Sequence, residues 1–232
     1  MAVEERSFPT AAEAADALAA AVAADIDRAL AQRERPGLVV SGGRSPIAFF
    51  ERLREAAIDW SRVVVTLADE RWVPPTHPDS NARLVAAHLL QGAAAAARFV
   101  PLWNGAPTPA AAIAERTAAL AELPRPFDAL VLGMGEDGHT ASLFPGAAGL
   151  AAALDPHGKA QLVAIDPQAA PHPRLSLTLA ALLDSRHIHL PLGGAAKHAV
   201  YRRAKADCDP LRLPVAAVLC QSRTPVTVYL GP

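Results

Sequence analysis

The sequence predicts an α/β fold, with residues 1–232 forming a single domain around a Rossmann-like, mostly parallel sheet that helices flank on both faces. Two patterns predict this fold. Short apolar runs of strand type alternate with amphipathic stretches of helix type, and several apolar runs end in polar or glycine-rich segments. A chain of 232 residues with 51% hydrophobic residues is also long and apolar enough to bury a sizeable core.

Capping and turn residues mark the elements of the first half. Thr10 followed by Glu13 is typical of a capping box, which predicts a helix from there to Gln32, and Pro36-Gly37 ends it. The apolar run 38–40 predicts a short strand. In chain order we then expect a helix at 47–57 after Pro46, a strand at 63–67, a polar loop at 72–80, a helix at 81–90 capped by 79–81, a strand at 99–103 and a helix at 110–123.

The second half continues the alternation. Asp128 to Leu132 is a strong apolar strand that runs into a glycine-rich turn. We further expect a strand at 162–165, a helix that begins at Arg174 and covers 175–183, a strand at 188–192, a helix at 195–206 and a closing strand at 226–230. Because ligands bind at the carboxyl ends of parallel strands, the segments 41–45, 69–83, 133–142 and 193–197 should converge on one edge of the sheet.

Composition excludes several classes of protein. Lys and Arg number 22 against 23 Asp and Glu, so the net charge is −1 and gives no support for binding nucleic acid or an anionic membrane. The alanine-rich stretch 11–31 carries several charges and is a poor membrane span, and residues 1–10 lack the apolar core of a signal peptide. We therefore expect a cytoplasmic protein. With only Cys208 and Cys220, a disulfide scaffold and a four-cysteine zinc site are excluded, and both thiols are expected to be reduced.

A glycine-rich turn at 133–138, followed by His139, is the first candidate for chemistry. It matches G-x-G-x-x-G after a strand, but a Pro-Gly pair soon cuts off the helix that a dinucleotide-binding fold needs, so a nucleotide site is disfavoured. A plain tight turn stays an alternative. Asp137 and His139 argue for more, since a histidine oriented by a carboxylate is a standard arrangement for taking a proton from water. Gly135 and Gly138 allow the backbone to approach a ligand.

The segment 41–46 is the second candidate. Two glycines before a helix start offer free backbone N–H groups and the positive end of the helix dipole, which suits a phosphate. No Gly-Lys-Ser/Thr follows, so a Walker A site is disfavoured, and an ordinary strand–helix turn is the alternative. The candidate phosphate contacts are Gly42, Gly43, Arg44 and Ser45.

Charged residues in other segments complete the candidate site. Asp69 and Arg71 flank Glu70 at the end of a strand, and Arg71 suits a carboxylate or phosphate. A solvated loop is the alternative there. Arg174 and Lys197 each begin an expected helix and can reach a phosphate from different sides, although isolated cations of this kind are more often surface charges.

The remaining histidines are scattered along the chain. His187 and His189 lie on one face of an expected strand at a spacing of two, which a metal could use, but the sequence fixes no third ligand and we expect no metal site. The sequence has no G-x-S-x-G elbow and no cysteine in a glycine-rich setting. A covalent nucleophile is therefore not indicated, with Ser142 the remaining candidate.

Together these motifs resemble the 6-phosphogluconolactonase family, over nearly the whole chain. The matching stretches, in order, are SGGRSP at 41–46, DERWVP at 69–74 with DSN at 79–81, GMGEDGHTASLFP at 133–145, and RLSLT at 174–178 followed by GAAK at 194–197. The related glucosamine-6-phosphate deaminases share the glycine turn and the histidine, but typically have Asn where this chain has Asp137. Arg44 departs from the family, in which a small residue is common there.

The resemblance implies hydrolysis of 6-phospho-D-glucono-1,5-lactone, a small sugar-phosphate lactone, to 6-phospho-D-gluconate without a metal or an organic cofactor. It implies that His139 is the general base, that Asp137 or Asp69 orients it, and that Arg71 or a backbone N–H of the glycine turn holds the oxyanion.

The same resemblance places the phosphate against the 42–45 loop, with Arg174 and Lys197 closing around it. Two alternatives stay open: an amino-sugar-phosphate isomerase or deaminase, and a non-catalytic module that binds a sugar phosphate. We expect a monomer or a small homo-oligomer.

Overall fold

A seven-stranded parallel sheet forms the centre of the computed structural model, which describes residues 3–43, 45–168 and 170–232. The strand order is β1-β10-β9-β6-β2-β3-β5, and every neighbouring pair is parallel. The strands are β1 (Glu4–Ser7), β2 (Gly37–Val40), β3 (Val64–Leu67), β5 (Arg98–Val100), β6 (Ala129–Val131), β9 (Ile188–Gly193) and β10 (Val226–Gly231). The predicted α/β fold with a mostly parallel sheet is therefore confirmed.

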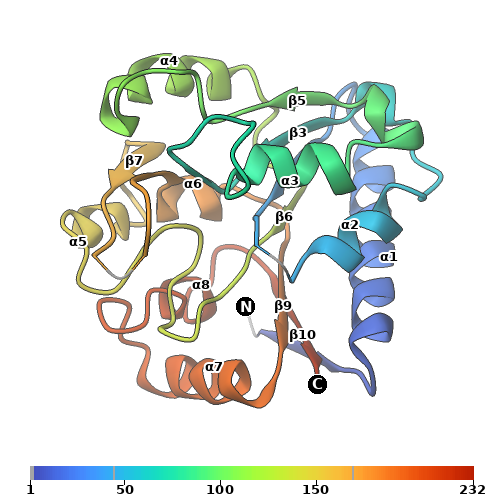
Figure 1. The fold of residues 1–232 in the computed structure, drawn as a ribbon. Coiled ribbons are helices and arrows are strands. Elements are labelled where there is room, and N and C mark those ends of the chain that lie inside the picture. The colour runs from blue at the N-terminus through green and yellow to red at the C-terminus, as the bar shows by residue number, and fades with distance from the viewer. Residues whose placement is uncertain (1–2, 44, 169) are drawn as a thin grey trace.

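Helices cover both faces of this sheet (Figure 1). α1 runs along one side and packs on β9 and β10, while α7 and α8 lie on the other side. The helices are α1 (Ala11–Leu30), α2 (Ile47–Leu53), α3 (Asn81–His88), α4 (Pro109–Ala121), α5 (Leu150–Ala153), α6 (Leu179–Leu183), α7 (Ala195–Asp207) and α8 (Ala216–Leu219), with short 3-10 turns at Trp60–Arg62 and Gly92–Ala96. The Thr10 hydroxyl accepts a hydrogen bond from the Glu13 N–H at 3.1 Å, as the capping box predicts.

A second, antiparallel sheet of order β4-β8-β7 was not predicted. Its strands are β4 (Asp69–Arg71), β7 (Leu162–Ile165) and β8 (Arg174–Leu177). The helix expected at 175–183 is therefore wrong in its first part, because only Leu179–Leu183 is helical. Thr178 separates the two elements: its hydroxyl accepts from the Ala181 N–H and caps α6, so the helix begins after this residue.

The two cysteines form a disulfide, which corrects the expectation of reduced thiols. Cys208 and Cys220 are bonded across 12 positions, with Cα atoms 6.0 Å apart. Cys208 ends α7 in the left-handed conformation, with φ of 47°, and so turns the chain back toward Cys220 at the end of α8. Helix periodicity alone carries no signal for such a turn, which is why the sequence did not reveal the pairing.

The core is made by strands that are apolar on both faces. Leu38, Val39 and Val40 of β2 have no exposed surface, as expected for a central parallel strand covered on both sides.

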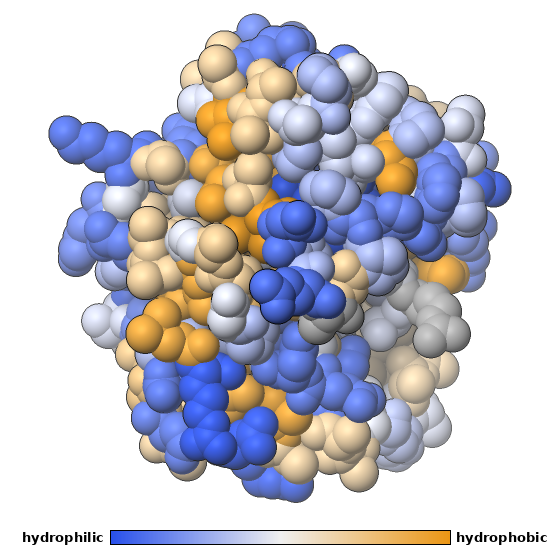
Figure 2. Space-filling view, turned by 60° about the vertical axis from the view of Figure 1, so that its left-hand side comes forward, coloured by the Kyte–Doolittle hydropathy of each residue, from blue (hydrophilic) through white to orange (hydrophobic). Residues whose placement is uncertain are grey.

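Figure 2 shows one outer face, where hydrophobic residues form small groups among polar ones. Within the described ranges, no helix is both long and apolar enough to cross a membrane.

Candidate active site

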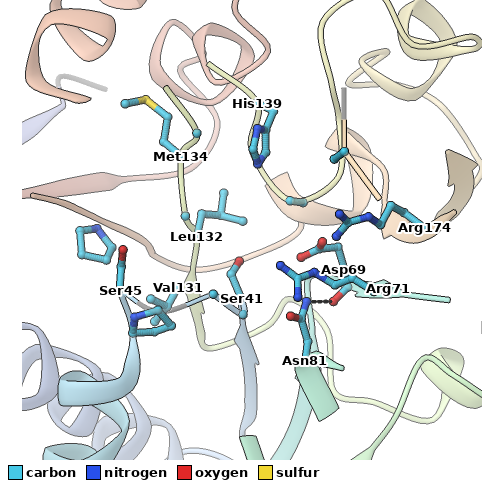
Figure 3. Close-up of a pocket in the computed structure, with 18 of the residues that line it drawn as sticks. Ser41, Ser45, Asp69, Arg71, Asn81, Val131, Leu132, Met134, His139 and Arg174 are labelled. Atoms are coloured by element: carbon cyan, nitrogen blue, oxygen red, sulfur yellow. Dashed lines mark hydrogen bonds between the residues drawn. The ribbon is translucent and has the colours of Figure 1, made fainter. Parts of the chain in front are cut away.

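The four predicted segments meet at the carboxyl edge of the large sheet, around a cavity of about 400 Å³. This confirms that they converge on one edge. The predicted residues that line it are Gly42, Gly43, Ser45, Asp69, Arg71, Gly135, His139, Arg174 and Lys197. In Figure 3, Ser41 and Ser45 lie on one side of the cavity, Asp69, Arg71 and Arg174 on the other, and His139 points in between them. Arg44, a predicted phosphate contact, lies outside the described residues.

A tight turn after β6 carries the histidine. The Gly135 N–H donates to the His139 carbonyl at 2.9 Å, and the Gly138 N–H donates to the Gly135 carbonyl at 3.0 Å. Gly138 needs the left-handed conformation, with φ of 81°. These two amides are used within the turn itself, so Gly135 and Gly138 shape its backbone.

Asp137 orients the imidazole of His139. Its Oδ1 lies 2.6 Å from His139 Nδ1 and also accepts the His139 backbone N–H at 3.1 Å. Burial raises the pKa of Asp137, but the hydrogen bond and the charge of His139 outweigh it and leave that pKa below its ordinary value. The ring of His139 also stacks on Phe144, with centroids 4.2 Å apart. Nε2 has no protein partner in the described ranges and faces the cavity, as a general base requires.

The small sheet places two arginines side by side. Arg71 and Arg174 are paired residues on the antiparallel strands β4 and β8. Arg71 donates from Nη1 to the Asp79 carbonyl at 2.6 Å, and Arg174 donates from Nη2 to the Pro171 carbonyl at 3.0 Å. Each Nε is buried and lacks a partner among the described residues. Burial, followed by the charge of Arg71, lowers the pKa of Arg174. Two neighbouring guanidinium groups, each with an unused Nε donor, fit an anionic ligand.

Asp69 contacts Ser142 and not the histidine. The Ser142 hydroxyl donates to Asp69 Oδ2 at 2.5 Å, and both side chains are buried. Of the two carboxylates predicted to orient the base, Asp137 is therefore the one in hydrogen-bond contact with it. Ser142 has no histidine partner among the described hydrogen bonds, so it does not form the serine–histidine pair of a serine hydrolase.

Sequence reasoning missed the structural role of Glu70. This fully buried carboxylate accepts the backbone N–H groups of Arg71, Asn81 and Ala82, each at 2.7 Å, and the Ser80 hydroxyl at 3.2 Å. Burial raises the pKa of Glu70 to about 6, against the opposing effect of these hydrogen bonds. Glu70 thus joins β4 to the first turn of α3, and its only sequence signal was its place between Asp69 and Arg71.

Asn81 was predicted only as a capping residue, yet its amide lines the cavity. Its Nδ2 donates to the Asp69 carbonyl at 2.9 Å, and its buried Oδ1 has no partner in the described part of the chain. A Cβ atom at Gly42 would overlap this amide, so the glycine allows the loop and α3 to approach closely. The N-cap itself is Ser80, whose hydroxyl accepts from the Arg83 N–H at 3.2 Å, in line with the predicted capping.

The glycine loop and the start of α7 form the other side of the cavity. Gly43 has a left-handed φ of 98°, which turns the loop away from β2 toward α2. The Ser41 hydroxyl is buried without a partner among the described residues, and Lys197 lies in the first turn of α7. Arg174 was predicted to begin a helix but begins β8, and it still reaches the cavity.

Comparison with known proteins identifies the family. The sequence model for "Glucosamine-6-phosphate isomerases/6-phosphogluconolactonase" matches residues 9–228. The chain belongs to this family. It is 47% identical to a 6-phosphogluconolactonase of Pseudomonas aeruginosa, with 100% of both chains covered, and 44% identical to one of Rhizobium meliloti, with 94% of each covered. A crystal structure of a 6-phosphogluconolactonase from Shewanella baltica superposes with a TM-score of 0.96 at 43% identity, covering 99% of this chain and 98% of that one.

Two clusters in the described ranges could hold a metal ion, and both lie outside the lining of the cavity. One is Asp25 with His187 and His189, and the other is His77 with Asp79 and His172. The prediction that the reaction of this family member needs no cofactor stays a prediction.

Proposed function

We propose that the protein hydrolyses 6-phospho-D-glucono-1,5-lactone to 6-phospho-D-gluconate in the oxidative pentose phosphate pathway. The observation that carries this proposal is the Asp137–His139 pair, held 2.6 Å apart at a cavity with Arg71, Arg174 and Lys197. Relatives named 6-phosphogluconolactonase that are 47% and 44% identical over nearly the whole chain support it.

In the proposed mechanism, His139 takes a proton from water through Nε2 while Nδ1–H donates to Asp137. The water oxygen attacks the lactone carbonyl carbon and gives a tetrahedral oxyanion. Collapse of that intermediate breaks the bond from this carbon to the ring oxygen, and the imidazolium returns its proton to the departing alkoxide. A positioned base of this kind contributes about 10²–10⁴-fold to the rate.

Cationic side chains and backbone N–H groups hold the two anionic parts of the substrate, the oxyanion and the phosphate. The oxyanion is held by Arg71 or by a backbone N–H of the 133–138 turn that the turn itself does not use. The phosphate binds at the 42–45 loop, with Arg174 and Lys197 closing around it. Binding this remote phosphate fixes the lactone for attack, so part of its binding energy lowers the barrier.

The test is the variant His139→Gln, which keeps most of the side-chain volume but removes the base. We expect kcat to fall at least about a hundredfold with little change in KM, in a lactonase assay corrected for spontaneous hydrolysis. His157→Gln is the matched control, because His157 is exposed and remote from the cavity lining. A kcat for His139→Gln close to that of the control would remove His139 from the mechanism.

The family also contains isomerases of amino-sugar phosphates, and the same assays separate that activity. Ammonia released from glucosamine 6-phosphate, without lactone hydrolysis, would assign the deaminase reaction. Tight binding of the sugar phosphate with neither reaction would assign a binding module. Asp137, bonded to the imidazole, favours hydrolysis, since related deaminases typically have Asn there.

We also propose that the protein acts in the cytoplasm, as a monomer or small homo-oligomer whose partner is the small-molecule lactone. The near-balanced charge supports a protein that binds neither nucleic acid nor membrane. Size-exclusion chromatography with light scattering measures the oligomeric state.

A further inference from the structure

A second cluster of ligand-type side chains lies at the opposite end of β9 from the cavity. Asp25 on α1 places its Oδ2 2.8 Å from His187 Nδ1 and 3.0 Å from His189 Nε2. The sequence offered the two histidines without a third ligand. The packing of α1 on β9 supplies it, from a position more than a hundred residues earlier in the chain.

The spacing of these three atoms is close to that of a metal site. All three ligand atoms lie within 4.8 Å of one another. Tetrahedral zinc with bonds of about 2.0–2.1 Å places neighbouring ligand atoms about 3.3 Å apart. The observed contacts of 2.8 and 3.0 Å therefore need to open by a few tenths of an ångström to admit the ion. Two imidazole nitrogens and one carboxylate oxygen form a donor set that zinc commonly takes.

Outer contacts fix all three side chains. His187 Nε2 lies 2.9 Å from Thr227 Oγ1, and His189 Nδ1 lies 3.0 Å from Tyr229 Oη. Arg28 donates to the other carboxylate oxygen of Asp25 at 2.7 Å. Metal-binding histidines nearly always have such a partner on the second ring nitrogen, because it sets the ring orientation and the tautomer.

The cluster can bind a cation without releasing a proton from either imidazole. Each imidazole has one ring nitrogen on Asp25 and the other on a hydroxyl, so its N–H can lie on either side according to the tautomer. When an ion binds, each imidazole keeps one proton but carries it on the outer nitrogen. That N–H then donates to Thr227 Oγ1 or to Tyr229 Oη, since a hydroxyl can accept as well as donate.

An opening leads from the cluster to solvent. His189 has no exposed surface and Asp25 is 9% exposed, but the side chain of His187 is 25% exposed. It lies in a cavity of about 340 Å³ whose other lining residues include Arg28 and Asp128. This cavity gives an ion a route in and leaves room for water as a fourth ligand.

We propose that Asp25, His187 and His189 bind one divalent cation of the zinc type, which links α1 to the sheet at the end remote from the active site. The ion takes no part in the proposed hydrolysis. Its position joins Asp25, early in the chain, to β9, so it stabilises the packing of α1 on the sheet.

The test is calorimetric titration of the metal-stripped protein with ZnCl₂. We expect one zinc ion per chain, a rise in Tm on adding zinc, and, with Co²⁺ in place of zinc, the visible absorption of a tetrahedral site. His187→Gln should weaken zinc binding at least about a hundredfold and abolish the rise in Tm. Because His187 does not line the candidate active-site cavity, retained lactonase activity and an unchanged circular dichroism spectrum show that this variant is folded.

The matched control is His172→Gln, which removes a histidine from the cluster of His77, Asp79 and His172. Zinc binding that survives in the control and is lost in His187→Gln supports the proposal. Two results overturn it: no zinc binding by the stripped wild-type protein, or zinc binding that His172→Gln abolishes and His187→Gln leaves unchanged. Neither result bears on the lactonase reaction, which has its own assay.

Discussion

Gly135 offers the sharpest test of how the proposed catalytic turn works, through the variant Gly135→Ala. A Cβ atom there would overlap His139 Cε1 and Nδ1 and Asp137 Oδ1, well inside the 3.4 Å at which ordinary van der Waals contact begins. Gly135 does not have a left-handed φ, so the backbone tolerates alanine and the substitution acts through space alone. The imidazole has to move by about 1 Å to make room, and a misplacement of this size costs about a hundredfold in rate.

We therefore expect Gly135→Ala to lower kcat about a hundredfold, which corresponds to about 2.7 kcal/mol of activation free energy. KM should change little, because the proposed phosphate contacts are elsewhere. The assay is steady-state lactone hydrolysis, with thermal unfolding to show that the variant is folded.

Gly193→Ala is the control, since the nearest atom to a Cβ there is the Pro232 carbonyl oxygen at an ordinary 3.5 Å. If Gly135→Ala kept kcat within about threefold of this control, the placement of the imidazole would not limit the reaction, and the reasoning would be refuted.

Three further predictions follow from the site and its surroundings. Lys197→Ala should raise KM about ten- to a hundredfold with a smaller effect on kcat, because a charge-assisted contact to phosphate is worth about 1.5–3 kcal/mol; an unchanged KM would remove Lys197 from the phosphate site. The pKa of Glu70, raised to about 6 from 4.5, means that its contribution to stability is complete below pH 4.5 and declines as pH rises through 6. The free energy of unfolding of the wild type minus that of Glu70→Gln should thus fall by about 2 kcal/mol over this range in urea titrations, and a rise would mean that the hydrogen bonds outweigh burial. Replacing Cys208 and Cys220 with serine should lower the free energy of unfolding by about 3 kcal/mol, from the closure of a 12-residue separation, and an unfolding curve that a reducing agent leaves unchanged would speak against the bond.

Most of the large sheet was predictable because its central strands are buried on both faces, whereas the exposed edge strand β1 was not predicted. The predicted strands 38–40, 63–67 and 128–132 are apolar apart from Thr66 and Asp128, and polar or glycine residues soon follow each of them, so strand and helix alternate visibly in the sequence. The small sheet lacks this signal. β4 is a charged segment of 3 residues, and β8 joins directly to a capped helix, so its apolar residues fit either period.

The contact between Asp137 and His139 could be predicted because chemistry and spacing coincide in one segment. Contacts between segments were beyond reach. Asp69 was equally plausible as the partner of the histidine until the packing placed it on Ser142 at 2.5 Å. Glu70 shows the same limit from the other side, because its four donors come from its immediate neighbour and from the start of α3. A one-dimensional pattern does not carry such distant hydrogen bonds.

Because the cavity is assembled from distant segments, its enzymatic activity also reports on the progress of folding. Its residues come from positions spread between Ser41 and Lys197, and β9 must enter the sheet between β6 and β10 before α7 can present Lys197. Parallel strands separated by long stretches of chain pair late, because the cost of closing the intervening loops comes first. During refolding we therefore expect far-ultraviolet circular dichroism to recover with the early helices, and turnover to recover only once β9 has paired with its neighbours. The recovery of hydrolysis thus reports when β9 has joined the sheet.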